Sequence, residues 1–213
     1  MSKLLLLLIL TISLHAHGGR VDKYGGHSLN GDYHKHDIKS KEGGYSRKNW
    51  KHWVDFDQDC QDSRAETLIK QSDIPVIFKT SRSCNVLYGQ WVCPYTLKIF
   101  FKANKTDIDH IVPLKEAYLS GASSWPKEKK KQFANDPDNL LVTSASANRS
   151  KGAKDPVKWM PKNGKCAYID RWIFIKEKYS LKFDPDELIK VMEINKHCKK
   201  LSLLLSDELN IEI

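Results

Sequence analysis

Two kinds of hydrophobic pattern divide the chain. Between residues 76 and 111, apolar and polar residues alternate over short runs, which is typical of β-strands. Beyond Pro113, apolar residues recur at helical spacing between Gly and Pro breakers. The pattern predicts strands over 76–79 and 97–101, a hairpin of 85–90 with 91–95 that turns at Tyr88-Gly89, and further strands over 107–111 and 139–142.

Six helices are expected, and several are bounded by capping residues. They cover residues 64–71, 114–120, 127–134, 144–151, 168–179 and 185–205. Asp62 or Ser63 is placed to cap the first helix, and Gly152 follows the fourth. The last helix opens with Asp184, Pro185 and Glu187, a capping-box arrangement. Strands followed by helices in a chain of this length predict one α+β domain of ordinary size plus appendages.

The strand that ends near His110 carries the candidate chemistry. On a strand, Asp107 and Asp109 leave the same face and His110 leaves the other. An amide, Asn139, and the segment Asn148-Arg149-Ser150-Lys151-Gly152 follow downstream. A one-metal phosphodiesterase needs an oxygen ligand for a hard cation, an imidazole that takes a proton from water, and cations that meet phosphate.

These residues resemble the HNH nucleases, whose core is the ββα-metal (His-Me finger) unit. In particular they resemble the GmrSD-type HNH family on Asp-His-Ile-Val-Pro-Leu (109–114), Ser-Gly-Ala (120–122), Ala-Asn-Asp (134–136), Asn-Leu (139–140) and Asn-Arg-Ser-Lys-Gly (148–152). The HNH domains of RNA-guided nucleases are also similar over 109–113 and 139–148. The resemblance implies an α+β fold with a ββα-metal core, a preceding β-hairpin region and C-terminal helices.

The resemblance also implies a role for each motif residue. His110 is the expected general base, drawing a proton from the water that attacks phosphorus. Asp109 and Asn148 are expected to bind one divalent cation. Many HNH proteins have a histidine where Asn148 stands, and the hard amide oxygen of asparagine favours Mg²⁺ or Mn²⁺. Asn139 is expected to tie the loop to the strand by side-chain hydrogen bonds, which keeps His110 aimed.

Three further residues complete the predicted site. Asp107 is expected either behind the metal ligands or as a spare ligand, with plain solvent exposure as the alternative. Arg149 and Lys151 are expected to contact phosphate, arginine through its planar fork, with ordinary surface charge as the alternative.

The first residues predict export. Residues 1–16 hold Lys3, an apolar run over 4–10 and Ser-Leu-His-Ala at 13–16, as expected for a secretory signal peptide that is cut after Ala16. The run is too short to span a bilayer. The mature protein is therefore expected to be secreted or periplasmic, with no membrane contact beyond the cleaved signal.

A segment rich in histidine and glycine follows. Residues 17–37 resemble the short secreted module called YHYH-like. His34 and His36 project on one side of a strand and, with His27 or His17, form a candidate site for a zinc or copper ion. A flexible tail that binds metals weakly is the alternative. Residues 38–50 are predicted to be a linker, residues 51–205 the nuclease domain and residues 206–213 a C-terminal tail.

Five cysteines suit an oxidising compartment, with two disulfides and one free thiol as the simplest count. Cys166 and Cys198 bracket two predicted helices, and related secreted HNH proteins resemble this chain there, so this pair is expected to be bonded. The predicted hairpin would place Cys84 opposite Cys93, although Cys60 fits either of them.

An acidic loop precedes the first predicted helix. Asp55, Asp57, Asp59 and Glu66 match positions 1, 3, 5 and 12 of an EF-hand calcium loop, but Cys60 stands where that loop needs glycine. A loop that leads into a capped helix is favoured over a calcium site.

The charge balance fits a polyanionic partner. The formal net charge is +9, and removal of Lys3 with the signal peptide leaves 34 basic against 26 acidic residues, or +8. The sequence thus predicts an exported, metal-dependent endonuclease that cuts DNA, in preference to RNA, with little sequence specificity. The alternative is an exported metal-binding or surface protein whose histidine segment is functional and whose HNH scaffold is inactive.

Overall fold

The protein is described by a computed structural model that covers residues 26–29, 32–35 and 44–209, with side chains from residue 44 to residue 202. The strands are β1 (Gly26–Leu29), β2 (Asp32–Lys35), β3 (Ile77–Phe78), β4 (Val86–Val92), β5 (Ile99–Lys102), β6 (Thr106–His110) and β7 (Leu140–Ser144). The α-helices are α1 (Ser63–Lys70), α2 (Leu114–Leu119), α3 (Lys127–Ala134), α4 (Ala145–Lys151), α5 (Lys165–Lys178) and α6 (Pro185–Leu209). Short 3-10 helices are η1 (Arg47–Asn49), η2 (Ala103–Lys105) and η3 (Ala122–Ser124).

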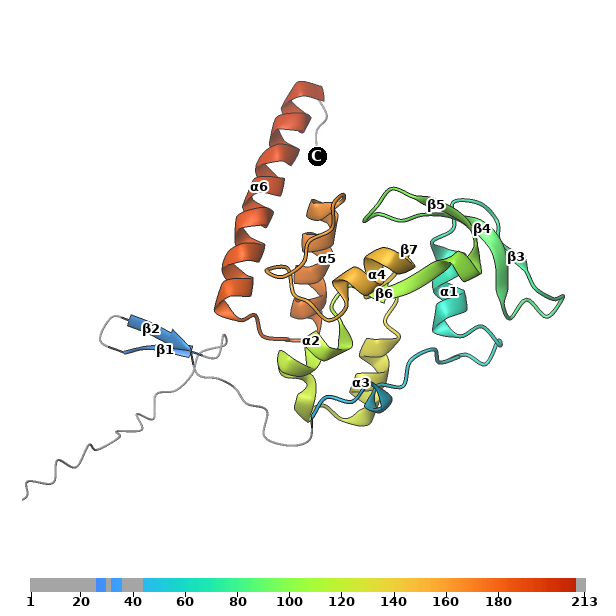
Figure 1. Ribbon diagram of the computed structural model, residues 1–213, viewed down its shortest axis with the longest axis horizontal. Helices are drawn as coiled ribbons and strands as arrows, with labels where there is room; N and C mark the ends of the chain where they lie inside the picture. Colours follow the sequence, from blue (N-terminus) through green and yellow to red (C-terminus); the bar gives the residue numbers. More distant parts are fainter. Residues whose placement is uncertain (1–25, 30–31, 36–43, 210–213) are drawn as a thin grey trace, which may run out of the picture.

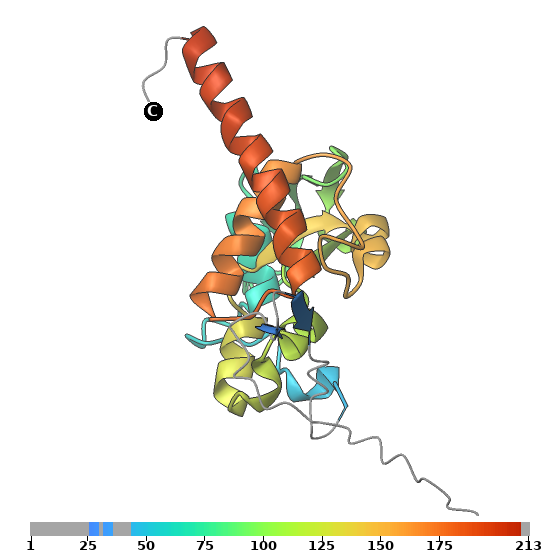
Figure 2. The same ribbon diagram turned by 90° about the vertical axis from the view of Figure 1, so that its left-hand side faces the viewer.

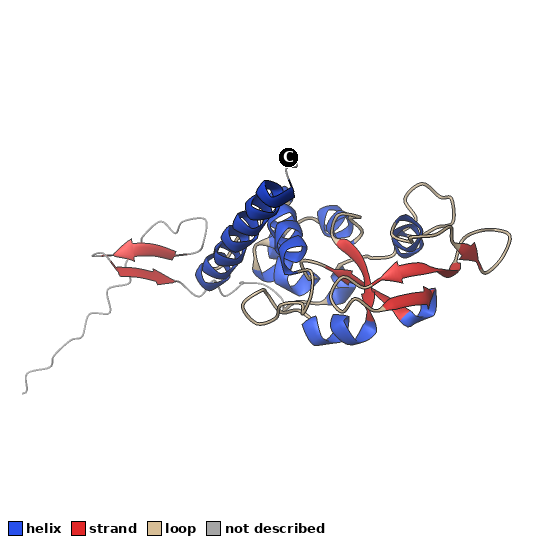
Figure 3. Ribbon diagram, turned by 90° about the horizontal axis from the view of Figure 1, so that it is seen from above, coloured by secondary structure: helices blue, strands red, loops and turns tan. Residues whose placement is uncertain are grey.

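Small antiparallel sheets and helices make up the described chain, as expected for a mixed α and β protein (Figure 1). One sheet has the order β3-β4-β5, and β1 pairs with β2. Seen from above, β3 to β7 gather on one side of the body and α5 and α6 on the other (Figure 3). The long α6 runs beside α5 and extends past the other elements (Figure 2).

The site strand β6 pairs with β7 and is followed, after β7, by α4. The register sets Asp107 opposite Thr143, Asp109 opposite Leu141 and His110 opposite Leu140. Helix α4 packs against both strands, and its start is fixed by Ser144, whose hydroxyl accepts a hydrogen bond from the backbone N–H of Ala147. The order strand, strand, helix is the order that the sequence predicted.

Two hydrophobic cores hold this strand pair from opposite sides. Ile108, Leu140 and Val142 belong to the core under α1 and β4. Ile111 belongs to the larger core formed with α2, α3, α5 and α6, and Leu141 packs against it. Because successive side chains of a strand point to opposite faces, each core receives every second residue of the pair. The strand that ends at His110 is therefore fixed on both faces.

The hairpin predicted at Tyr88-Gly89 is wrong, because β4 runs through these residues as one strand. Gly89 is needed here for close packing and does not form a turn. A Cβ at this position would lie 2.6 Å from Cζ2 of Trp91 and 2.7 Å from Oγ of Ser72. The Trp91 ring is fully buried, and its Nε1–H donates to the Leu68 carbonyl at 2.8 Å.

The cysteines form two disulfides and leave one free thiol, which is the expected count. The Cys166–Cys198 disulfide is present and joins α5 to α6. The other disulfide joins Cys60 to Cys84, and Cys93 is a buried free thiol. Of the pairings that the sequence left open, Cys60 with Cys84 is the one observed, because the continuous strand β4 separates Cys84 from Cys93 along its length.

The linker predicted over 38–50 is also wrong over its described part. Tyr45 packs against the larger core, and Trp50 is a member of it with 1% of its surface exposed. The folded domain therefore begins before residue 51. Among the described residues, no helix combines the length and the apolar character that a membrane crossing needs.

Replacing Gly89 by alanine is expected to destabilise the protein by about 1–3 kcal/mol, because the added methyl must displace the buried Trp91 ring. Urea denaturation measures this loss. Gly44→Ala is the matched control, since a Cβ there meets nothing within 4 Å. Equal stability of the two variants would contradict the packing role of Gly89.

Candidate active site

A cleft of about 310 Å³ opens beside the end of β6. It is lined by residues of the segment before α1, of β6, of the start of α2 and of the end of α4: Tyr45, Arg47, Ile108, Asp109, His110, Pro113, Leu114, Lys115, Asn148, Gly152 and Ala153. The three residues expected to meet, Asp109, His110 and Asn148, thus line one cleft although 39 positions separate the first from the last.

The imidazole of His110 is held by one backbone contact. Its Nε2 lies 2.8 Å from the carbonyl oxygen of Ala134. Because a carbonyl only accepts hydrogen bonds, Nε2 must carry the hydrogen, and Nδ1 then holds the lone pair. The indole of Trp53 stacks on the ring, with 6.1 Å between centroids and 29° between planes. The ring is therefore fixed in one tautomer that can accept a proton at Nδ1.

Burial keeps this imidazole neutral. Desolvation lowers the pKa of His110 from 6.5 to about 3; the hydrogen bond to Ala134 partly opposes this shift, and electrostatic interactions with Arg47, Lys151 and His52 reinforce it. At neutral pH the side chain is an uncharged base. A negative charge brought into the cleft would raise its proton affinity.

Asp109 belongs to a buried ion pair. Its Oδ1 accepts from the ammonium of Lys151 at 2.9 Å, and its Oδ2 accepts from the hydroxyl of Tyr95 at 2.8 Å. Burial raises the pKa of the Asp109 carboxyl and lowers the pKa of Lys151, while the attraction between them opposes both shifts. Lys151 also donates to the His110 carbonyl at 2.7 Å.

The predicted role of Lys151 as a phosphate contact is therefore corrected. Its side chain has no exposed surface, and its ammonium is held by Asp109 and by the backbone of β6. Helix α4 presents this residue to the core, whereas the neighbouring Arg149 is exposed on the same helix. Of the two cations expected to meet phosphate, only Arg149 is placed to do so.

Asn148 is oriented by Asp107. The Nδ2 of Asn148 donates to Oδ2 of Asp107 at 3.2 Å. The amide oxygen is then the atom left to accept from a ligand or to bind a cation. Asp107 is half-buried and thus stands behind Asn148, as a residue that orients a ligand would.

Asn139 ties the loop after His110 to the start of β7. Its side chain is completely buried, its Oδ1 accepts from Val112 N–H at 2.9 Å, and its Nδ2 donates to the Val112 carbonyl at 3.2 Å. The backbone carbonyl of Asn139 accepts from Ile111 N–H at 2.9 Å. These are bonds of the kind that the sequence predicted for this residue.

The donors at the cleft suit a hard divalent cation. Asp109 offers carboxylate oxygens, each of which keeps a lone pair beyond the hydrogen bond it already accepts, and Asn148 offers an amide oxygen. Oxygen donors of this kind are typical ligands for Mg²⁺ or Mn²⁺. The residues present therefore fit the cation that an HNH site requires.

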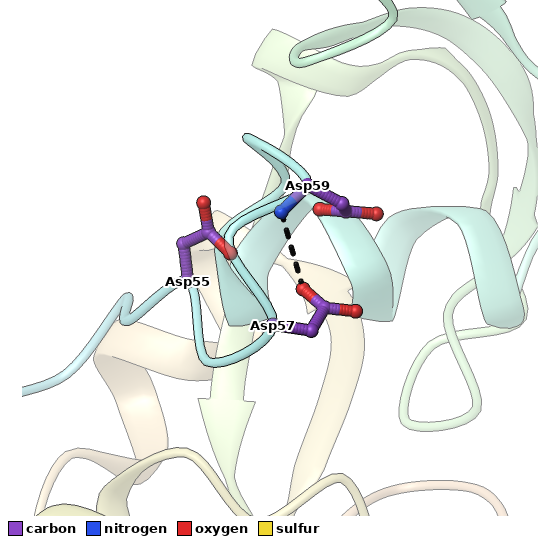
Figure 4. Close-up of side chains that lie close together, drawn as sticks. All are labelled: Asp55, Asp57 and Asp59. Carbon is purple, nitrogen blue, oxygen red and sulfur yellow. Dashed lines mark hydrogen bonds between the residues drawn. The ribbon is translucent and has the colours of Figure 1, made fainter.

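A second acidic group lies away from this cleft, in the loop before α1. Ligand oxygens of Asp55, Asp57 and Asp59 lie within 4.8 Å of one another (Figure 4). The carboxylate of Asp55 accepts from the backbone N–H groups of Gln58 and Cys60, at 2.8 and 2.9 Å. Asp62 caps α1 by accepting from Ala65 N–H at 2.9 Å, as expected for a loop that leads into a capped helix.

The predicted histidine site is covered only in part. The register of β1 and β2 sets His27 directly opposite His34. His17 and His36 lie outside the described residues, so the site remains a prediction.

Four residues of the site region were missed by the sequence analysis. Arg47 and Lys115 line the cleft, Tyr95 binds Asp109, and Trp53 stacks on His110. Tyr95 lies in the predicted hairpin strand, and Arg47 lies in the predicted linker. No local pattern marks any of them, because each reaches the site through tertiary packing.

Comparisons with known proteins agree with the motif. A family model described as "GmrSD restriction endonucleases, C-terminal domain" matches residues 58–187. A protein of Arthroderma benhamiae named "Uncharacterized secreted protein" is 34% identical over 142 residues, which cover 65% of this chain and 68% of that protein. No solved structure matches.

Removing one partner of the Lys151–Asp109 pair is expected to cost about 3–5 kcal/mol of stability, because the other charge stays buried without compensation. Urea denaturation of Lys151→Met measures this. Arg149→Met, on the exposed side of the same helix, should stay within about 0.5 kcal/mol of wild type. Equal losses in the two variants would show that Lys151 is not buried.

Acidification is expected to destabilise the fold through His110. Its folded-state pKa of about 3 lies below the ordinary 6.5, so the unfolded chain binds more protons between these values. Stability is therefore lost as the pH falls from about 6.5 toward 3, by up to about 1.4 kcal/mol per pH unit.

The matched comparison is His110→Gln, which lacks a titrating ring. Burial raises the pKa of Glu187 to about 7, which gives an opposite trend over part of this range, but both proteins share it. The free energy of unfolding of wild type, measured in urea, should therefore fall relative to that of His110→Gln as the pH decreases from 7 to 4. A constant difference would contradict a buried neutral imidazole.

Proposed function

The chain belongs to the family of GmrSD restriction endonuclease C-terminal domains, and we propose on this premise that it is an exported endonuclease that hydrolyses DNA phosphodiester bonds. His110 acts as the general base, and one divalent cation, Mg²⁺ or Mn²⁺, assists. Cleavage has little sequence specificity and leaves 5′-phosphate and 3′-hydroxyl ends, as the family resemblance implies.

The observation that carries this proposal is the state of the His110 ring. Its Nε2 is committed to the Ala134 carbonyl, and no described side chain bonds to Nδ1. His110 is among the residues that line the cleft, together with Asn148 and two cationic residues, Arg47 and Lys115. A neutral imidazole with one free nitrogen in such a cleft is suited to take a proton from water.

In the proposed reaction, Nδ1 of His110 accepts the proton of the water that attacks phosphorus. The bond to Ala134 and the stacked Trp53 keep the ring from rotating as it becomes charged. The low pKa of His110 in the free protein is compatible with this role, because the negative phosphate stabilises the imidazolium that forms.

Asp109 and Asn148 would hold the cation, with Asp107 orienting Asn148 and Lys151 and Tyr95 fixing Asp109. When bound, the cation neutralises charge on the phosphate and on the leaving 3′-oxygen. Asn139 holds the loop that carries His110. These residues therefore divide into ligands and the residues that position them.

Substrate affinity is proposed to come from contacts with phosphate. Arg149 is exposed next to Asn148, and the described carboxylates form no ion pair with it. Contacts of this kind do not read bases, and the affinity they give falls steeply with salt.

Export is supported by two observations besides the first sixteen residues. The Arthroderma benhamiae relative is named as secreted. Two disulfides, Cys60–Cys84 and Cys166–Cys198, suit an oxidising compartment. We propose that the protein acts outside the cytoplasm.

An accessory metal site is proposed on the hairpin of β1 and β2. Opposite residues of an antiparallel pair share one face, and the register makes His27 and His34 such a pair. With His17 or His36 they would bind a zinc or copper ion. If this site alone were functional, zinc would bind tightly, would be lost in His27→Ala with His34→Ala, and plasmid would stay intact with every metal.

The test is relaxation of supercoiled plasmid by the mature protein with Mg²⁺, Mn²⁺, Zn²⁺ or EDTA. Wild type is expected to cut with Mg²⁺ or Mn²⁺ and not with EDTA. His110→Ala is expected to lose about 10²–10⁴-fold in rate, the usual contribution of a general base. His110→Gln serves as a second variant in case the smaller side chain unsettles the fold.

The matched control is His197→Ala, which removes an exposed histidine of α6 that does not line this cleft. Circular dichroism and thermal melting verify that each variant is folded. A folded His110→Gln that cuts as fast as wild type would end the assignment of the base. Cleavage of RNA alone would retain the mechanism and change the substrate.

A further inference from the structure

Part of the cleft is lined by residues that precede the region matched by the family model. The family model begins at residue 58, whereas Tyr45 and Arg47 line the cleft and Trp53 stacks on His110. We call residues 45–54 the N-terminal segment. It includes η1, which lies beside α3 (Figure 1).

The N-terminal segment is anchored at two points. Trp50 is 1% exposed and packs edge-on against Phe133, with 5.7 Å between ring centroids. The side chain of Asn135 binds the backbone, since its Oδ1 accepts from Val54 N–H at 3.0 Å and its Nδ2 donates to the Lys51 carbonyl at 2.7 Å. These contacts fix the path of the segment across the end of α3.

Trp53 adopts a conformation that bulky residues avoid. Its φ is +59°, in the left-handed region that favours glycine. Such strain is retained where surrounding contacts impose it, and here the result is an indole laid flat on the candidate base. A tryptophan in this position excludes water from one face of His110 and limits rotation of the ring.

Arg47 brings an unpaired positive charge to the cleft. It is exposed, and among the described residues no carboxylate forms an ion pair with it. Its guanidinium is hydrogen-bonded to the hydroxyl of Tyr45. A planar guanidinium without an anionic partner, in a cleft that Lys115 also lines, is suited to bind a phosphate through two parallel hydrogen bonds.

We propose that the N-terminal segment is part of the active site, in which Arg47 binds a backbone phosphate of the nucleic acid and Trp53 positions His110. This inference rests on the proposed nuclease function. It assigns Arg47 the role predicted for Lys151, whose ammonium is buried. Arg47 contributes to substrate binding, and Trp53 acts only through the orientation of the imidazole.

The first test compares Arg47→Ala, Arg47→Lys and Lys48→Ala in the full mature chain. Lys48 is the control because it is an exposed cation of the same turn that does not line the cleft. Binding of a fluorescent DNA duplex is measured with EDTA over a range of salt. Loss of one phosphate contact should reduce the slope of log Kd against log salt by about 0.9 in Arg47→Ala.

The kinetic expectation follows from the same contact. Arg47→Ala should raise KM by about 10- to 100-fold with a small change in kcat, as loss of a charged hydrogen bond does. Arg47→Lys should recover part of the affinity, since it restores the charge without the fork. Lys48→Ala should leave both constants within about twofold, as surface substitutions usually do.

The binding measurement separates this inference from the proposed function. If wild type fails to cut with any metal but binds with the Arg47-dependent slope, the nuclease proposal fails and the phosphate contact stands. If wild type cuts and Arg47→Ala matches Lys48→Ala in slope and KM, the role of Arg47 is overturned. Failure of wild type to bind DNA at all would overturn it too.

The second test addresses Trp53 as a positioning residue. Trp53→Leu should lower kcat at unchanged KM, whereas Trp53→Phe, which restores a flat ring, should recover most of the rate. If Trp53 had a purely structural role, the activity lost in each variant would instead match the fraction of that variant found unfolded by thermal melting. Equal kcat values in folded Trp53→Leu, Trp53→Phe and wild type would refute positioning of His110 by this residue.

Discussion

The site depends on the buried ion pair between Lys151 and Asp109. Two charges removed from water are stable only when their remaining hydrogen-bonding groups are satisfied. Here Tyr95 and the carbonyl of His110 supply those bonds. The pair locks the end of α4 onto β6, and Asn148 lies three residues earlier on the same helix face. Asn148 therefore reaches the cleft because Lys151 is held behind it.

A second buried lysine, Lys176, holds α2 against α5 and α6. Lys176 of α5 has no exposed surface, and its ammonium binds Glu116 of α2 at 2.9 Å and Glu187 of α6 at 2.6 Å. Ser120 and the Lys182 carbonyl complete its partners. Since α2 starts directly after Pro113, this network supports the loop that follows His110. Buried lysine ion pairs thus stabilise two of the elements that line the cleft, α4 and α2.

The sequence predicted what local rules decide. The strands that became β6 and β7, the cap at Ser144 and the Asn139 hydrogen bonds follow from periodicity and motif. It did not predict Gly89 within β4, because a glycine serves either a turn or close packing, and only the Trp91 ring decides between them. The prediction that Lys151 contacts phosphate was wrong for a similar reason, since spacing along a short helix does not show which face is buried.

The N-terminal segment shows the limit of such rules most clearly. It follows Gly43-Gly44 and contains Ser46 and three basic residues, a composition typical of a linker. What makes it part of the domain is the burial of Trp50 against Phe133, a contact across 83 positions. The motif supplies the candidate reacting groups, but the stacked indole over His110 and the exposed guanidinium at the cleft are Trp53 and Arg47. Both residues precede the stretch that the family model matches, so the candidate site extends beyond the family pattern.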